Sequence, residues 1–301
     1  MSDIKLFRLD SAGVTQLEAK SVVIEKRLQI RMESHLESFL GVRLLASEYL
    51  TGKVHGGRID TLGIDENNSP VIIEYKRSLN ENVVNQGLFY LDWLLDHRGE
   101  FQLLVMKRVG ADIEAEINWP GTRLICIAAD FTRYDEYAVA QISRNIELLR
   151  YKSYGEDLLL LELVNSTSGT VAAQDGEPKA GASSSKTVME SLEKSPAELV
   201  DLYHQLDAFL KALGDVQVNV TKTYIAYRRI KNFACVAVSP MYRMLIAWVK
   251  VNPNSITLED KFTRDVSSIG HAGTGDLEIT IHSVADLEKA KPLFAASYEA
   301  S

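Results

Sequence analysis

Asp60, Glu74 and Lys76 are residue types that could together do chemistry on a phosphate. Two carboxylates held about 5 Å apart repel each other unless a cation or a proton lies between them. A divalent metal would resolve this repulsion, and oxygen ligands of this kind suit Mg²⁺ or Mn²⁺. A nearby lysine could activate a water or stabilise charge on the phosphate. The alternative is a solvent-exposed face with surface ion pairs, because matches to a short D…ExK pattern recur by chance.

A predicted β-hairpin brings these three residues together. Residues 58–64 and 71–76 are rich in isoleucine and valine and flank a turn-forming segment centred near Asn67. Antiparallel pairing about that centre places Asp60 opposite Glu74, and the alternation of side chains puts both carboxylates and the lysine on one face. The second strand is apolar on both faces up to its glutamate, which indicates a buried strand whose polar end opens at a sheet edge.

A predicted helix over residues 82–97 follows the hairpin. Its apolar residues recur at helical spacing and are expected to form a core stripe: Val84, Leu88, Leu91 and Leu95. A second stripe carries Gln86, Tyr90, Trp93 and His97. Because residues four apart lie one above the other on a helix, Gln86 and Tyr90 would present an amide and a phenol together at the mouth of the hairpin.

The order and spacing of Asp60, the Glu74-Tyr75-Lys76 triplet and Gln86-x-x-x-Tyr90 resemble the PD-(D/E)xK nuclease superfamily, in particular its RecB-like branch with the QxxxY signature. Residues 20–165 are most similar to the catalytic domain of NucS/EndoMS-type endonucleases. This resemblance implies a restriction-endonuclease-like mixed sheet flanked by helices. It also implies Mg²⁺- or Mn²⁺-dependent hydrolysis of phosphodiester bonds in nucleic acid, with DNA favoured over RNA.

The resemblance extends to further site residues. Glu25, on a helix that precedes the hairpin, and Glu48, in a Glu-Tyr strand, correspond to acidic residues that join Asp60 and Glu74 as metal ligands in these enzymes. Lys76 would help to activate water and steady charge on the phosphate, and the Gln86 and Tyr90 side chains would orient the site or touch DNA.

Two departures from the family pattern limit what the resemblance implies. Ile59 stands where the superfamily name has proline, which leaves Asp60 usable. The mismatch endonucleases carry an N-terminal DNA-binding and dimerising domain, whereas only about 20 residues precede the first predicted helix here. Mismatch specificity is therefore not carried over, although a homodimer remains compatible with the sequence.

The elements around the hairpin predict an α/β layer structure with a mixed sheet. A helix is expected over 21–40, ended by Gly41, with Glu33 and Glu37 facing solvent. Strands are expected at 43–50, 101–106, 124–129 and 158–164, an edge strand at 4–9 and a helix at 135–151. The loop over 52–57 contains three glycines, which allow close approach of a ligand.

Composition and charge limit the class of protein. The chain of 301 residues has 46% hydrophobic and 25% charged residues, no apolar run long enough for a membrane helix and no signal peptide, so we expect a cytoplasmic protein without a membrane partner. Cys126 and Cys235 have apolar neighbours and are expected to be buried thiols. The net charge of −8 disfavours general affinity for nucleic acid, so contacts would depend on a local patch. The candidates are Lys53, Arg58 and Arg77, next to His55 and Lys76.

A compositional break divides the chain after the nuclease-like domain, residues 1–165. Residues 166–194 contain few large apolar residues and read as a flexible linker. Residues 195–301 predict a smaller α+β domain that resembles an uncharacterised, DUF5655-like domain. Its first helix, to residue 213, is expected to open with a Ser195/Glu198 capping box, and its last helix, 284–297, with Ser283 and Asp286.

Two functions follow from these patterns. The first is a metal-dependent nuclease with the site described above. The second is a non-catalytic nucleic-acid- or protein-binding module on a nuclease-like fold, with the C-terminal domain as the working part. In that domain, residues 224–231 interleave tyrosines with positive charge, as a nucleic-acid surface does. A twisted hairpin built from ordinary strand-forming residues would have the same pattern.

Overall fold

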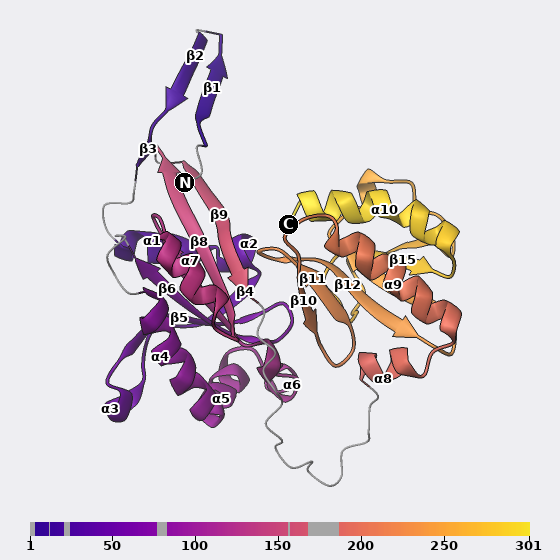
Figure 1. Ribbon diagram of the computed structural model, residues 1–301, viewed down its shortest axis with the longest axis horizontal. Coiled ribbons are helices and arrows are strands. Elements are labelled where there is room, and N and C mark those ends of the chain that lie inside the picture. The colour runs from indigo at the N-terminus through magenta and orange to yellow at the C-terminus, as the bar shows by residue number, and fades with distance from the viewer. Residues whose placement is uncertain (1–3, 12, 21–24, 77–82, 156, 168–186) are drawn as a thin grey trace. The chain divides into compact units, whose positions relative to one another are not determined.

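The computed structural model describes residues 4–11, 13–20, 25–76, 83–155, 157–167 and 187–301. Figure 1 shows the elements of its two compact units. The first unit contains residues 1–65, 70–117 and 122–170, and the second contains residues 66–69, 118–121 and 171–301. The expected fold class, a mixed α/β sheet flanked by helices and followed by a smaller α+β domain, is confirmed.

The first unit is built on a seven-stranded mixed sheet of order β3-β8-β7-β6-β5-β4, with β9 pairing β8. Its strands are β3 (Ala19–Lys20), β4 (Val42–Leu50), β5 (Arg58–Asp65), β6 (Pro70–Lys76), β7 (Arg123–Ala128), β8 (Asn145–Tyr154) and β9 (Leu158–Thr167). The pairs β6–β7 and β7–β8 are parallel, and the other pairs are antiparallel. The central strands β6 and β7 are almost wholly buried, as expected for strands covered on both faces.

Helices cover this sheet and set the position of the candidate site. They are α1 (Glu25–Ser34), α2 (Leu36–Leu40), α3 (Gly52–His55), α4 (Val83–Asp96), α5 (Arg98–Arg108), α6 (Ala111–Ala115) and α7 (Arg133–Ala140). The helix expected over 21–40 is interrupted at His35, and residues 21–24 lie outside the described part of the chain. Gly41 ends α2 as expected: its φ is 63°, and its N–H donates to the Glu37 carbonyl.

Two expected elements were wrong. The run 101–106 belongs to helix α5, with Phe101 and Val105 buried one turn apart. The run 135–151 divides into the short helix α7 and the strand β8, which is buried on both faces although it carries the charged residues Glu147 and Arg150. Short apolar runs fit either a strand or a buried helix segment, and packing decides between them.

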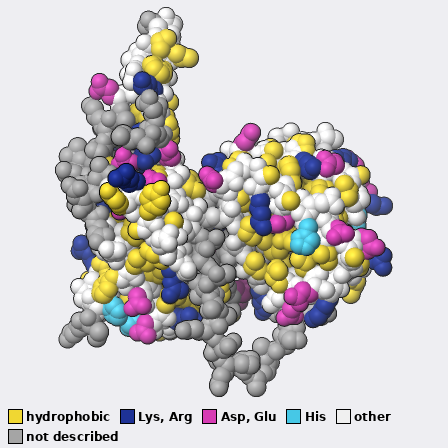
Figure 2. Space-filling model, viewed as in Figure 1, with side chains coloured by type: hydrophobic (Ala, Val, Ile, Leu, Met, Phe, Trp, Pro, Cys, Tyr) yellow, Lys and Arg dark blue, Asp and Glu magenta, His cyan; other side chains and the backbone are white. Residues whose placement is uncertain are grey.

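The N-terminal segment forms a separate hairpin instead of an edge strand of the main sheet. Among the described residues, strands β1 (Leu6–Asp10) and β2 (Gly13–Leu17) pair with each other and with no other strand. Their side chains are exposed, and the apolar ones include Leu9, 75% exposed, and Val14, 69% exposed. Figure 2 shows these apolar side chains along the hairpin at the top of the view.

The second unit has a six-stranded antiparallel sheet of order β10-β11-β12-β13-β15-β14. The strands are β10 (Gln217–Val220), β11 (Ile225–Arg228), β12 (Asn232–Ser239), β13 (Met244–Val249), β14 (Thr263–Asp265) and β15 (Leu277–Ile281). The helices α8 (Val188–Glu193), α9 (Ala197–Lys211) and α10 (Val284–Glu299) provide apolar residues to its core.

The boundaries of the second unit differ in detail from those expected. Much of the linker, residues 168–186, lies outside the described part of the chain, but helix α8 forms inside the expected linker span. The Ser195/Glu198 capping box is absent, because Pro196 takes the N-cap position and Ser195 Oγ donates to the Ser191 carbonyl instead. The second capping box, between Ser283 and Asp286 of α10, is confirmed.

Candidate functional site

The hairpin of β5 and β6 has the register expected from the sequence. Leu62 pairs with Ile72, and the regular ladder ends at the pair of Thr61 and Ile73. The next opposed residues are Asp60 and Glu74. At this point the carboxylates accept hydrogen bonds that backbone carbonyls accept elsewhere in the ladder.

Asp60 and Glu74 are bound to each other's strands. The Asp60 N–H donates to Glu74 Oε1 at 3.1 Å, and the Tyr75 N–H donates to Asp60 Oδ2 at 3.1 Å. The two carboxylates are therefore held beside each other by reciprocal hydrogen bonds across the hairpin. The structure thus brings together the two residues on which the predicted metal site depends.

Burial raises the electrostatic cost of this arrangement. The Glu74 side chain is fully buried. Burial also raises the pKa of Asp60, although the hydrogen bond from Tyr75 and the positive charges of Lys76 and Arg58 oppose the increase. Two carboxylates in this environment favour a bound proton or a bound cation over two free negative charges.

Lys76 ends β6 and is partly exposed, so its ammonium group has access to solvent near Asp60. Arg77 lies outside the described residues, and so do the side chains of Glu25 and Lys53. Within the described part of the chain, no group of three or more His, Cys, Asp or Glu side chains could hold a metal ion. The assignments of Glu25, Lys53 and Arg77 stay predictions.

Glu48 is engaged by two cations. Its carboxylate lies 2.5 Å from Lys26 Nζ and 2.7 Å from Arg58 NH1, and the hydrogen bond from Lys26 holds the Glu48 pKa below its ordinary value. Glu48 also has a φ of 55°, an uncommon conformation for a residue other than glycine. A metal ion would have to compete with Lys26 and Arg58 to bind Glu48. A phosphate would have to compete with Glu48 to bind Arg58.

Helix α1 provides a polar contact that sequence reasoning missed. Gln29 is almost fully buried and donates from Nε2 to the Asp60 carbonyl at 2.7 Å. The same amide nitrogen lies 3.0 Å from Glu33 Oε1, which also accepts a 2.6 Å hydrogen bond from Thr61 Oγ1. The expectation that Glu33 faces solvent was therefore wrong. The spacing of Lys26, Gln29 and Glu33 could have indicated these contacts, because residues three and four positions apart share one face of α1.

Helix α4 holds the loop before Asp60 in place. Tyr90 Oη accepts hydrogen bonds from the Arg58 N–H at 3.1 Å and from Gln86 Nε2 at 3.3 Å. The Tyr90 ring packs so closely on Gly57 that a Cβ added there would lie 2.5 Å from Tyr90 Cε1. Tyr90 is only 6% exposed, and its hydroxyl and ring hold the start of the hairpin in place.

The buried face of α4 also differs from the expected stripe. Tyr90 and Trp93 are buried, whereas Leu88 and Leu95 are only partly buried. Gly87 explains why the buried face of α4 is rotated from the expected one, because a Cβ at this position would lie 2.5 Å from Leu124 Cδ1 of β7. The glycine faces the sheet and lets the helix approach it closely.

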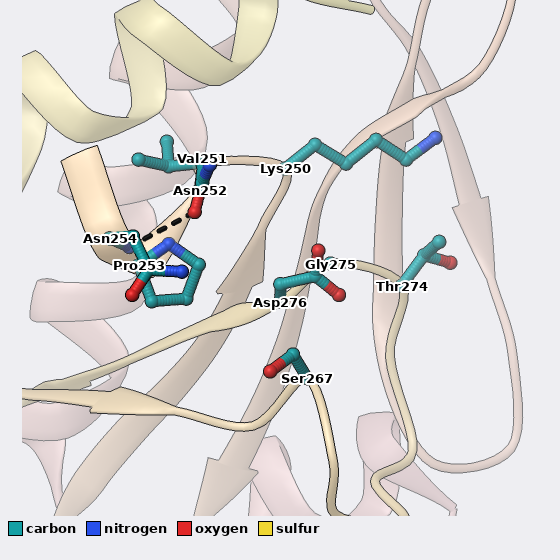
Figure 3. Close-up of a pocket in the computed structure, with 9 residues that line it drawn as sticks. All are labelled: Lys250, Val251, Asn252, Pro253, Asn254, Ser267, Thr274, Gly275 and Asp276. Atoms are coloured by element: carbon teal, nitrogen blue, oxygen red, sulfur yellow. Dashed lines mark hydrogen bonds between the residues drawn. The ribbon is translucent and has the colours of Figure 1, made fainter.

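The second unit contains a pocket of about 650 Å³ (Figure 3). Its lining consists of Lys250, Val251, Asn252, Pro253, Asn254, Ser267, Thr274, Gly275 and Asp276. Asn252 Oδ1 accepts a hydrogen bond from the Asn254 N–H, so this side chain stabilises its own turn.

The expected nucleic-acid surface over 224–231 is largely internal: Tyr227 is fully buried, and its hydroxyl donates to Asp207 Oδ1 at 2.8 Å. Cys126 and Cys235 are buried free thiols, as expected.

No helix among the described residues is long and apolar enough to cross a bilayer.

Comparisons with known proteins support the C-terminal resemblance alone. A family model described as a domain of unknown function, DUF5655, matches residues 188–301. An uncharacterized protein of Haemophilus influenzae is 26% identical over 295 residues, which cover 95% of this chain and 96% of that protein. No solved structure matches the chain. Residues 188–301 are therefore similar to a domain of unknown function, and the nuclease likeness of residues 20–165 stays a prediction.

Proposed function

We propose that the first unit is a metal-dependent nuclease that hydrolyses phosphodiester bonds of nucleic acid, with DNA as the preferred substrate. The observation that carries the proposal is the reciprocal hydrogen bonding of Asp60 and Glu74 at the end of the β5–β6 ladder. Backbone N–H groups hold both carboxylates side by side, and burial makes a cation a favourable partner for them.

Asp60 and Glu74 are the residues that would hold Mg²⁺ or Mn²⁺. Two carboxylates suffice, because Mg²⁺ in phosphate-processing sites usually keeps several waters and binds one or two carboxylates together with substrate phosphate oxygens. When bound, such an ion lowers the pKa of a coordinated water and neutralises charge on the phosphate. Lys76, at the end of the same strand, would donate to the phosphate or to the attacking water.

Residues on the helices around the hairpin would support this pair. Gln29 holds the Asp60 carbonyl, and Tyr90 holds the Arg58 N–H, so helices α1 and α4 fix β5 from two directions. Arg58 is still 58% exposed while it pairs with Glu48, and an incoming phosphate could exchange for that carboxylate. A cytoplasmic location, a homodimer and DNA contacts by Lys53 and Arg77 belong to the same proposal.

A second candidate is a nuclease-like module that binds nucleic acid or protein without cleavage. The observation that favours it is the double ion pair of Glu48, which occupies an expected metal ligand with Lys26 and Arg58. In this case the hairpin carboxylates serve only to end the ladder.

Cleavage assays separate the two candidates. The full chain is incubated with Mn²⁺ or Mg²⁺ and with single-stranded, duplex, branched and mismatched DNA and RNA. Glu74→Gln keeps an oxygen that can accept the Asp60 N–H, so it is expected to fold while losing more than about 100-fold in cleavage rate. Glu37→Gln, a change at an exposed position of α2, is the matched control. Cleavage that survives unchanged in Glu74→Gln and Asp60→Asn would show that this site is not the catalytic centre.

A further inference from the structure

A row of aromatic rings runs from the candidate site to the surface of the first unit. Phe89 of α4 is 46% exposed, and its ring centroid lies 5.3 Å from that of His55 in α3 and 5.7 Å from that of Tyr90. The His55 ring in turn meets His97 edge to face at 5.6 Å. Figure 1 shows α3 and α4 on the same side of the first unit.

The inner part of this row is packed firmly. Trp93 is 1% exposed and stacks on His97 with the centroids 5.0 Å apart and an interplanar angle of 18°. Tyr49 packs against Trp93 at 5.4 Å. His97 Nδ1 also contacts the Trp93 carbonyl at 3.0 Å, so the rings under the exposed residues have fixed positions.

The outer rings lie one side chain away from the candidate site. Tyr90 Oη accepts from the Arg58 N–H, and Arg58 precedes the candidate ligand Asp60 by two residues. Phe89 is adjacent to Tyr90 on α4, and the centroids of the two rings are 5.7 Å apart, so Phe89 lies next to the side chain that holds the start of the Asp60 strand.

We propose that Phe89 and His55 form a stacking platform for a nucleobase of single-stranded nucleic acid beside the phosphate to be cleaved. This inference rests on the proposed nuclease function and narrows its substrate class. Aromatic side chains bind unpaired bases through their π faces with little sequence preference. The bases of an intact duplex are already stacked on one another, so the platform favours single strands, strand ends and unpaired flaps.

Binding measured without cleavage tests the platform directly. Fluorescein-labelled 12-nucleotide single-stranded DNA, single-stranded RNA and duplex DNA are titrated with the full chain in EDTA, and fluorescence anisotropy gives Kd. Phe89→Ala is expected to weaken binding of the single strands by about 5-fold to 100-fold, the range for loss of one stacked base, and to change duplex binding less. Phe89→Trp is expected to restore or improve it. Leu103→Ala is the matched control, because Leu103 is a similarly exposed apolar residue on α5.

The outcomes distinguish the platform from the catalytic site. Single-strand binding that is equal in wild type, Phe89→Ala and His55→Ala overturns the platform, even if Mn²⁺-dependent cleavage is present. A Kd that rises only in the Phe89 and His55 variants supports the platform. If the same protein shows no cleavage with any metal ion, the nuclease proposal fails and the platform stands. Tighter binding of duplex than of either single strand also overturns it. The relative Kd for DNA and RNA then identifies which single strand the platform prefers.

Discussion

Removal of a buried charge in the first unit should destabilise it far more than removal of a similar charge at the surface. Arg123 of β7 is 2% exposed and makes two hydrogen bonds to Glu147 of β8, from Nε at 2.9 Å and from NH2 at 2.7 Å. Its NH1 lies 3.0 Å from Asp65 Oδ2 of β5. Although burial disfavours the charged form, Glu147 and Asp65 hold the Arg123 pKa above its ordinary value, so the guanidinium stays charged.

Glu147→Gln is the perturbation that tests this network. Glutamine can accept one of the two hydrogen bonds, but its NH₂ group then faces an arginine donor. Of the two carboxylates that neutralise the buried guanidinium, Asp65 and Glu147, the charge of Asp65 alone remains. Breaking a buried ion pair from one side costs about 3 to 5 kcal/mol. For a unit of this size, 1 kcal/mol corresponds to roughly 2 to 4 °C, so the melting temperature should fall by about 6 to 20 °C.

The matched comparison is Glu162→Gln. Glu162 of β9 pairs with Arg150 of β8 at 2.9 Å, but it is 26% exposed. Loss of this pair should cost less, because water reaches the Glu162 carboxylate and the Arg150 guanidinium keeps its 2.6 Å ion pair with Asp130. Scanning calorimetry of the full chain measures both variants and shows whether the transition of the second unit stays in place. Equal destabilisation by the two substitutions would refute the argument from burial.

Three further predictions concern the site and its supports. Mn²⁺ at about 100 times its Kd should stabilise the first unit by about 2.7 kcal/mol in a thermal-shift assay, and Glu74→Gln should abolish the shift, while a shift retained in this variant would place the ion elsewhere. Because burial raises the Asp60 pKa, protonated Asp60 contributes stability that is fully present below the ordinary aspartate pKa of about 3.9 and is lost as pH rises through the raised value. Urea unfolding between these two pKa values should therefore show a smaller loss of unfolding free energy with rising pH in Asp60→Asn than in wild type. Mn²⁺ binding to wild type should weaken on the acidic side. An equal dependence of unfolding free energy on pH in the two proteins would contradict the raised pKa. Gly87→Ala should destabilise the first unit by about 1 to 3 kcal/mol, since the new Cβ would meet Leu124. The control Gly99→Ala on α5 has open space around the new Cβ and should have little effect. Higher stability of Gly87→Ala in chemical unfolding would show that Leu124 can move aside.

The hairpin shows what local sequence patterns can determine. A cluster of turn formers centred near Asn67, between two runs of β-branched residues, specified the pairing of Leu62 with Ile72, because the centre of a hairpin turn determines which residues lie opposite each other. The same reasoning placed Gly41 at the end of α2 and Ser283 at the start of α10. In each case a residue type with a local conformational preference coincides with the end of an apolar pattern.

The elements that sequence reasoning misplaced are those whose character depends on packing. Residues 145–154 form a strand buried between neighbours on both sides, and residues 98–108 form a helix that buries Phe101 and Val105. The apolar run 101–106 fits either conformation, and the charged residues Glu147 and Arg150 of 145–154 are buried in ion pairs that no local pattern indicates. Only the position of the neighbouring layers decides which backbone conformation buries them with its hydrogen bonds satisfied.

For the candidate site, the sequence by itself determined the hairpin, its register and the opposition of Asp60 and Glu74, because strand pairing follows from alternation and turn position. Tertiary structure alone decided how these carboxylates are held and which side chains surround them. The ion pairs of Glu48, the contact of Gln29 with the Asp60 carbonyl and the burial of Tyr90 against Gly57 join residues 10 to 33 positions apart in the chain. Such contacts arise when helices α1 and α4 pack on the sheet, and no local preference of the residues themselves specifies them.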